Sequence, residues 1–142
     1  MTAIAYRDGI LAGDTLWGDG GLKTYDSKVS KYRGHLVGMC GNDVPSVADI
    51  IKWFFWDKAD VKRKTEFEKV DFQLLVIDPN GVIWVCDNRG MMHKVKSEFW
   101  AIGTGAHVCL GAMEVGANAK EAVKAAIKWA DGCGGTVITK RL

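Results

Sequence analysis

The sequence lacks the patterns that mark several common classes of protein. Its four cysteines include no pair separated by two residues, and its three histidines show no H-x-x-x-H spacing, so the usual zinc-binding patterns are absent. No apolar run approaches the roughly 20 residues that a membrane-spanning helix needs. The 19 basic residues barely exceed the 17 acidic ones, and a net charge of +2 gives no basic surplus for binding nucleic acid.

These absences lead to several expectations about the protein. The N-terminal stretch carries Arg7, Asp8 and Asp14 where a signal peptide would need an unbroken apolar segment. We therefore expect a cytoplasmic protein with reduced core cysteines, no cofactor, and no nucleic-acid or membrane partner. With 48% hydrophobic residues, the 142-residue chain is long enough to form one domain over residues 1–142 with a substantial core.

The pattern of apolar residues predicts many short strands. The Asn80-Gly81 pair predicts the clearest hairpin, because both residues adopt the positive φ angles that such a turn requires. The glycine-rich segment 17–23 predicts an irregular turn. The expected strands are Thr2–Arg7, Ile10–Asp14, Thr24–Tyr32, His35–Cys40, Asp71–Asp78, Val82–Asp87, Met91–Val95, Phe99–Ile102 and Thr136–Leu142.

Three helices are expected among these strands, over Val44–Lys58, Ala106–Val115 and Lys120–Asp131. Runs of strands separated from helices predict a layered α+β fold. The first helix is apolar around nearly its whole circumference and includes Trp53 and Trp56. Such a helix is either enclosed within its own fold or covered by another subunit, since large aromatic surfaces are rarely left in water.

The first fourteen residues contain a candidate nucleophile. Removal of Met1 would leave Thr2 with a free α-amine beside its own hydroxyl, and an N-terminal threonine can use that amine as its base. A hairpin of the first two strands would return Asp14 to the neighbourhood of Thr2. Cys133 with His107 is an alternative nucleophile and base, but nothing in the sequence places these two together.

Five stretches, in this order, resemble the proteasome β-subunit family, and the likeness extends over nearly the whole chain. The chain is most similar to the smaller bacterial branch of this family, typified by the HslV peptidase. The resemblance implies an N-terminal nucleophile (Ntn) hydrolase with a four-layer αββα sandwich of two antiparallel sheets. The five stretches are T-A-I-A-Y-R-D-G-I-L-A-G-D, S-K-V-S-K-Y, L-V-G-M-C-G-N, A-I-G-T-G-A and A-D-G-C-G-G-T.

The resemblance also implies a role for each matching residue in a threonine endopeptidase. The α-amine would be the general base, and a lysine cation nearby would lower the pKa of that amine from its usual 7.7–8.0. Lys31 and Arg33 are alternative cations under a shifted alignment. The implied catalytic residues are Thr2 as nucleophile, Asp14 and Lys28 beside it, Gly41 as oxyanion donor, Thr104 near the amine, and Asp131 as a supporting carboxylate.

Further sites follow from the same resemblance. Met39, Cys40 and Asn42 would line a substrate pocket beside Thr2. The carbonyl groups of Ala130, Cys133 and Thr136 match a monovalent-metal loop of some family members.

The family further implies a homo-oligomeric ring or ring-like assembly, peptide or unfolded-protein substrates, and an ATPase unfoldase as a partner. The chain is shorter than its family between Lys58 and Asp71, and this loss would expose the surface of Trp53 and Trp56 and alter the assembly. If Met1 stays attached, Thr2 has an amide in place of its base. The alternative is then a catalytically silent homologue that serves as an assembly or binding module. Hydrolysis of a small amide by the same residues is a third hypothesis.

Overall fold

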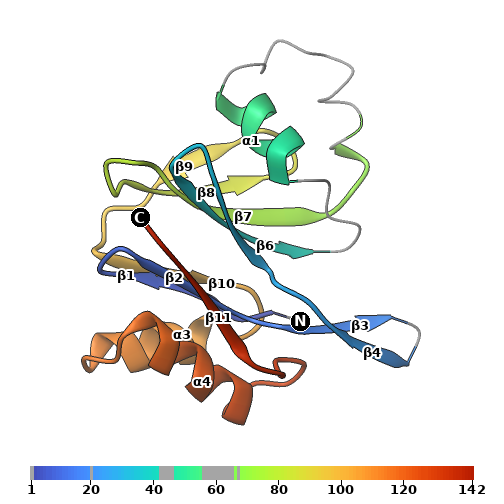
Figure 1. The fold of residues 1–142 in the computed structure, drawn as a ribbon, viewed down its shortest axis with the longest axis vertical. Helices are drawn as coiled ribbons and strands as arrows, with labels where there is room; N and C mark the ends of the chain where they lie inside the picture. The colour runs from blue at the N-terminus through green and yellow to red at the C-terminus, as the bar shows by residue number, and fades with distance from the viewer. Residues whose placement is uncertain (1, 20, 42–46, 56–65, 67) are drawn as a thin grey trace.

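Two antiparallel sheets face each other, and helices cover both outer sides (Figure 1). The computed structural model describes residues 2–19, 21–41, 47–55, 66 and 68–142. The predictions about Met1, Asn42 and Trp56 lie outside these residues, as does most of the shortened segment 59–70.

The first sheet holds both ends of the described chain. Its strands lie in the order β10-β1-β2-β11, and every neighbouring pair is antiparallel. Their bounds are Phe99–Ile102 for β10, Ile4–Arg7 for β1, Ile10–Asp14 for β2 and Val137–Arg141 for β11.

The second sheet is formed by the middle of the chain in simple sequence order, β5-β6-β7-β8-β9. It is antiparallel throughout, and its neighbours are joined along the chain. Its strands are β5 (Val29–Tyr32), β6 (His35–Gly41), β7 (Phe72–Ile77), β8 (Ile83–Asp87) and β9 (Met92–Lys94).

Three described helices form the outer layers. Helix α1 (Val47–Phe55) covers the second sheet, while α3 (Ala106–Glu114) and α4 (Ala119–Trp129) cover the first (Figure 1). Helix α4 begins with a capping box in which the Asn118 side chain accepts the Glu121 N–H at 2.8 Å. The predicted αββα sandwich is confirmed. None of the helices in the described ranges is long and apolar enough to cross a membrane.

Alternation along the first strand sends side chains into two different layers. Ala3 and Ala5 face α3 and α4 within a cluster of small residues, whereas Ile4 and Tyr6 face the second sheet. The cluster between the sheets is made of larger residues: Ile4, Tyr6, Leu11, Val29, Leu36, Leu75, Ile77, Ile83 and Ile102. The small residues on the other face let the helices lie close to β1, the strand that follows Thr2.

Glycine lets the two sheets approach each other near that strand. A Cβ atom on Gly38 would lie 2.5 Å from Ile4 Cγ2, and one on Gly13 would lie 2.9 Å from Val29 Cγ1. Both distances are far below a normal carbon–carbon contact of 3.5–4.0 Å. The inter-sheet packing around Ile4 and Val29 therefore depends on these two missing side chains.

The prediction of an irregular segment at 17–23 is wrong. Strands β3 (Leu16–Asp19) and β4 (Leu22–Tyr25) pair as a hairpin that projects from the sandwich (Figure 1). Gly21, at φ +86°, forms part of the hairpin turn. The predicted strand Thr24–Tyr32 is correspondingly divided, because β4 ends before Asp26 and β5 begins after Lys28.

The Asn80-Gly81 hairpin is present, but its turn differs from the prediction. Among the described residues, positive φ at both central positions occurs at Asp8–Gly9 and Arg33–Gly34, whereas at 80–81 only Gly81 has it. The Asp78 side chain accepts the Asn80 N–H at 2.9 Å and so stabilises a different turn.

Trp53 belongs to the interior of its own chain. It is 2% exposed and packs with Ile50 and Ile51 against the outer face of the second sheet. A Cβ on Gly90 would lie 2.8 Å from its ring, so the loop after β8 closes over the indole. Trp53 is therefore enclosed within its own fold and does not meet another subunit. The two alternatives stay open for the aromatic residues 54–56, whose side chains lie outside the description.

The four cysteines are free thiols, as predicted. Cys86, Cys109 and Cys133 are buried, and Cys40 is partly buried. Burial is the main reason that the pKa of Cys109 rises to about 12, so this thiol stays protonated at neutral pH.

Two Gly→Ala substitutions should change stability in opposite directions. Gly38→Ala should lower the free energy of unfolding by about 1–3 kcal/mol, because the new methyl group would overlap the Ile4 side chain. Gly111→Ala lies in α3 with open space around it and should raise that free energy by up to about 1 kcal/mol. Urea unfolding followed by circular dichroism measures both. A neutral Gly38→Ala would contradict the tight inter-sheet packing.

Candidate active site

The loop between β10 and α3 holds the backbone of Thr2. The Gly105 N–H donates to the Thr2 carbonyl at 3.0 Å, and the Thr2 nitrogen donates to Thr104 Oγ1 at 3.1 Å. Gly103 has φ +92°, and a Cβ there would collide with the Thr2 carbonyl group. Thr2 itself is 3% exposed. The segment Gly-Thr-Gly thus fixes Thr2 by close backbone contact as well as by hydrogen bonds.

Asp14, at the end of β2, is held by three donors. Its Oδ1 accepts the Ala3 N–H at 3.0 Å and the Lys28 ammonium at 2.9 Å, while its Oδ2 accepts the Gly134 N–H at 3.1 Å. Both oxygens of this buried carboxylate therefore have hydrogen-bond partners. Because Ala3 follows Thr2 directly, the carboxylate also fixes the position of the candidate nucleophile.

The Lys28 side chain is fully buried against Asp14. Neither side chain of this ion pair is accessible to solvent. The backbone carbonyl of Lys28 accepts the Met39 N–H at 3.0 Å, which ties the residue to β6. The half-buried indole of Trp17 lies 5.2 Å from Nζ and adds a cation–π contact. A lysine in this position delivers a positive charge to the interior next to Thr2.

Cys133 lies beside the same loop. Its Sγ is 3.9 Å from Thr104 Oγ1, and burial is the main cause that raises the pKa of its thiol. A raised pKa disfavours the thiolate that nucleophilic attack requires. His107, its hypothetical base, is an exposed residue of α3. A cavity of 350 Å³ reaches Cys133 and is also lined by Leu16, Gly18, Lys23 and Gly132.

The residues predicted near Thr2 on β6 point to different layers. The Met39 side chain packs against the cluster beneath α1, whereas Cys40 packs against the cluster between the sheets. Only Cys40 of the two therefore faces the layer that holds Thr2. Burial raises the pKa of the Cys40 thiol, and the Lys28 charge opposes that rise. Asn42, the third predicted pocket residue, is outside the described part of the chain.

Gly41 is the last residue of β6 and pairs with Phe72 of β7. Its φ angle is +133°. A Cβ at this position would collide with the backbone carbonyl of Asp71. Glycine is therefore required here by the neighbouring strand, whatever its chemical role. Its use as an oxyanion donor stays a prediction.

The last group of predicted residues lies in the turn between α4 and β11. Asp131 is exposed at the start of this turn, away from the buried interior where Asp14 lies. The Thr136 carbonyl, one of the three proposed ion ligands, accepts the Thr15 hydroxyl at 3.3 Å. Across the described ranges, no group of three or more His, Cys, Asp or Glu side chains is arranged to hold a metal ion.

Two contributors to the site were missed in the sequence. Gly134 acts through its backbone N–H, which no side-chain pattern reveals. Trp17 lies in the glycine-rich segment 17–23, which the sequence predicted to be irregular. The contact between its indole and Lys28 could therefore not be foreseen. The hairpin containing Trp17 is anchored by Leu16, because Gly134 leaves room for that side chain.

Comparison with solved structures identifies the fold. The BPH protein of Thiobacillus denitrificans in complex with epoxomicin matches with a TM-score of 0.72 at 20% identity, covering 99% of this chain and 97% of that one. A second BPH structure gives 0.65 at 19% identity, with 99% and 96% covered. The eukaryotic HslV from Trypanosoma brucei gives 0.67 at 14% identity, with 98% and 97% covered.

These likenesses show that the chain shares the fold of the BPH and HslV structures. They cover nearly the full length of each chain, so the shared architecture is not confined to one half of the sandwich. No protein-family model and no curated protein matches the sequence.

Removal of one member of the buried ion pair should be more harmful than removal of both. Asp14→Asn should lower the free energy of unfolding by about 3–5 kcal/mol, because Lys28 would keep a buried charge without its carboxylate. Adding Lys28→Met should recover part of that loss by removing the charge. Urea unfolding of wild type, both single variants and the double variant gives the coupling energy. Losses that simply add would show that the two side chains are not coupled.

Proposed function

We propose that the chain is a threonine-type peptide hydrolase whose nucleophile is Thr2, exposed as the N-terminal residue by removal of Met1. The observation that carries this proposal is the buried Asp14–Lys28 pair, which shares a carboxylate oxygen with the backbone of Ala3. Burying two charges is costly, and apolar residues of similar size would often be as stable. A fully buried ion pair beside a candidate nucleophile therefore supports a functional role for the two side chains.

The arrangement supports a complete acyl-transfer cycle. The Thr2 hydroxyl attacks the peptide carbonyl and gives its proton to the α-amine, while the Lys28 charge favours the neutral form of that amine beforehand. The backbone N–H of Gly41 stabilises the oxyanion. Collapse of the intermediate breaks the C–N bond and passes the proton to the leaving amine. Water then hydrolyses the ester on Thr2 and restores the hydroxyl.

Thr104 has a positioning role in this proposal. Its Oγ1 accepts a hydrogen bond from the Thr2 nitrogen. This contact would orient the lone pair of the amine relative to the Thr2 hydroxyl. Asp14 holds Ala3 and Lys28 together and thereby fixes the charge relative to the amine. Asp131 is too exposed to share the buried network and is given no step.

The proposal extends to the setting of the reaction. Peptides or unfolded proteins are the substrates, and several copies of the chain enclose the site in a ring or ring-like oligomer in the cytoplasm, with an ATPase unfoldase as partner. Support comes from the fold that the chain shares with HslV and BPH structures.

Intact mass and a covalent probe test the nucleophile. We expect natively expressed protein to lack Met1 and to gain the mass of epoxomicin, the compound in one of the matching BPH structures. Thr2→Ala should gain nothing, since it has no hydroxyl, while Thr2→Ser should react. Protein that keeps Met1 in full would contradict the proposal and favour the catalytically silent assembly module.

The contact of Thr104 with the Thr2 nitrogen gives a second test. Thr104→Val keeps the shape but removes the acceptor, and should slow adduct formation about tenfold, the value of one hydrogen bond of about 1.4 kcal/mol. Thr104→Ser keeps the acceptor and should react at nearly the wild-type rate. The pH profile of the reaction should shift only in the valine variant, because only there does the amine lose its acceptor. Equal rates and profiles in both variants would contradict a positioning role.

A further inference from the structure

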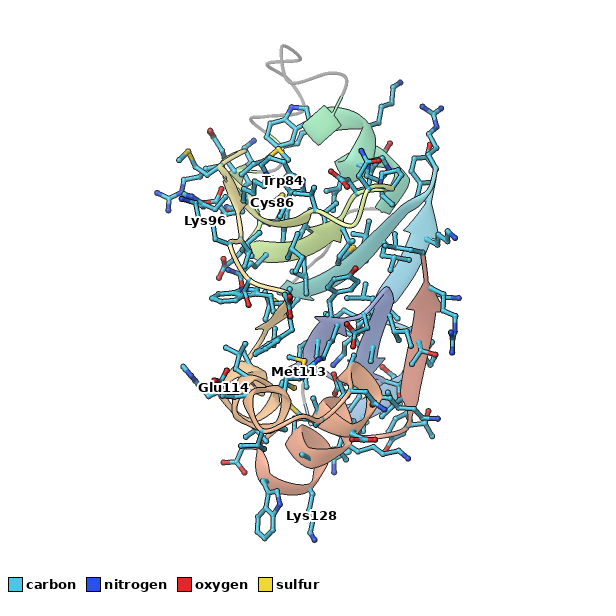
Figure 2. The ribbon with its side chains drawn as sticks, turned by 90° about the vertical axis from the view of Figure 1, so that its left-hand side faces the viewer. Trp84, Cys86, Lys96, Met113, Glu114 and Lys128 are labelled. Carbon is cyan, nitrogen blue, oxygen red and sulfur yellow. The ribbon has the colours of Figure 1, made fainter. Side chains whose placement is uncertain are left out.

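A second cavity lies at the edge of the sandwich where β9 and β10 meet. Its volume is 470 Å³, within the range of small-ligand and peptide side-chain sites. In Figure 2 this edge lies on the left-hand side, where Lys96 is on the segment after β9 in the upper part and Met113 is on α3 in the lower part. The cavity is lined by Gln73, Val85, His93, Val95, Trp100, Ala101, Ile102, Gly103, Ala106, His107 and Leu110.

The lining shows that the backbone edge of β10 faces this cavity. Four consecutive residues, Trp100 to Gly103, take part in it. Side chains along a strand alternate between its two faces, so consecutive residues can share one cavity only along the strand's edge. Strand β10 pairs with β1 on its other side, and no further strand of the described residues pairs with the edge that borders the cavity.

The two sheets differ in width at this edge. Within the described ranges the second sheet has five strands and the first has four. The inner face of β7 to β9 therefore extends past β10, and Gln73, Val85 and His93 of that face form the opposite wall of the cavity. Neighbouring strands lie about 4.8 Å apart, so a strand added beside β10 would lie over this extended part of the second sheet.

We propose that this cavity binds an extended peptide as a fifth strand of the first sheet, and that the peptide is the part of the substrate that follows the scissile bond. The second half of the proposal rests on the proposed hydrolase function. Pairing with a free strand edge supplies backbone hydrogen bonds whatever the peptide sequence, and side-chain pockets add selectivity.

Continuity with Thr2 favours the substrate as occupant. Gly103 lines the cavity and also contacts the Thr2 carbonyl, so the cavity ends beside the candidate nucleophile. β10 runs toward Thr2, and antiparallel pairing is the more stable arrangement. A peptide paired in this way has its N-terminal end at Gly103, which is the end that would be joined to the scissile bond.

The lining also indicates which peptides fit. Its walls are mainly aliphatic and aromatic, and its hydrogen-bonding side chains are two imidazoles, one amide and the Trp100 indole. It contains no acidic residue. An apolar strand that carries one carboxylate would bury its apolar side chains against these walls. Its carboxylate would find hydrogen-bond donors and no acidic side chain to repel it. We therefore expect a preference for aliphatic residues with an acidic residue among them.

Peptide binding to the full Thr2→Ala protein tests this without any need for catalysis. The probe is a fluorescein-labelled hexapeptide of valine and leucine with one central glutamate, followed by fluorescence polarisation. The same peptide with alternate backbone N-methyl groups cannot pair as a strand and should bind about tenfold more weakly or not at all. His107→Asp should weaken binding of the glutamate peptide more than that of its glutamine version. The control Lys124→Asp, exposed on α4, should change neither.

Cross-linking locates the peptide. A photoreactive phenylalanine analogue at its N-terminal end should label the segment around Gly103. Equal binding of the N-methylated peptide, or labelling of the β3–β4 hairpin instead, would overturn the proposal. So would a native mass showing an oligomer that His107→Asp dissociates, because the cavity would then be an interface between copies. If wild type forms no epoxomicin adduct, the proposed hydrolase fails, whereas strand pairing is still decided by these binding measurements.

Discussion

The buried ion pair of Asp14 and Lys28 is the constraint around which the site is built. One carboxylate joins three parts of the chain: the N-terminal strand through Ala3, the start of β5 through Lys28, and the turn after α4 through Gly134. Each of these contacts supplies a donor, so the buried charge is satisfied only when all three segments are in place. The ion pair thus makes the local geometry at Thr2 depend on the fold as a whole.

The site depends on glycines, which have no side chain, as much as on its polar residues. Gly13 and Gly38 let the sheets meet around Val29 and Ile4, and Gly103 lets the loop before α3 lie against Thr2. A methyl group at any of these positions would separate layers whose spacing sets the hydrogen bonds of the site. Close packing and candidate chemistry therefore depend on the same few positions in the sequence.

Much of the architecture could be predicted, because strand alternation and glycine turns are local signals. The order of the elements predicts only a layered α+β fold. The resemblance supplied the αββα sandwich and located Thr2, Asp14, Lys28 and Thr104, which the structure brings together. The hairpin carrying Trp17 was missed, since glycine content alone does not separate a hairpin from an irregular loop.

Two further features could not be read from the sequence because they depend on tertiary contacts. The direction of Met39 follows from the register of β6 against its neighbours, and a shift of one residue would reverse it. The burial of Trp53 depends on the loop at Gly90, 37 positions along the numbering, which closes over its ring.

The contacts around Thr2 also have a consequence for folding during synthesis, because they join segments that lie far apart in the sequence. Thr104 lies 102 residues further along the chain, and Gly134 lies 120 residues beyond Asp14. A ribosome synthesises the segment that contains Thr2 well before the turn after α4. A growing chain therefore carries Thr2 without these partners until the turn after α4 has been synthesised, so the site is assembled only after both distant segments have emerged.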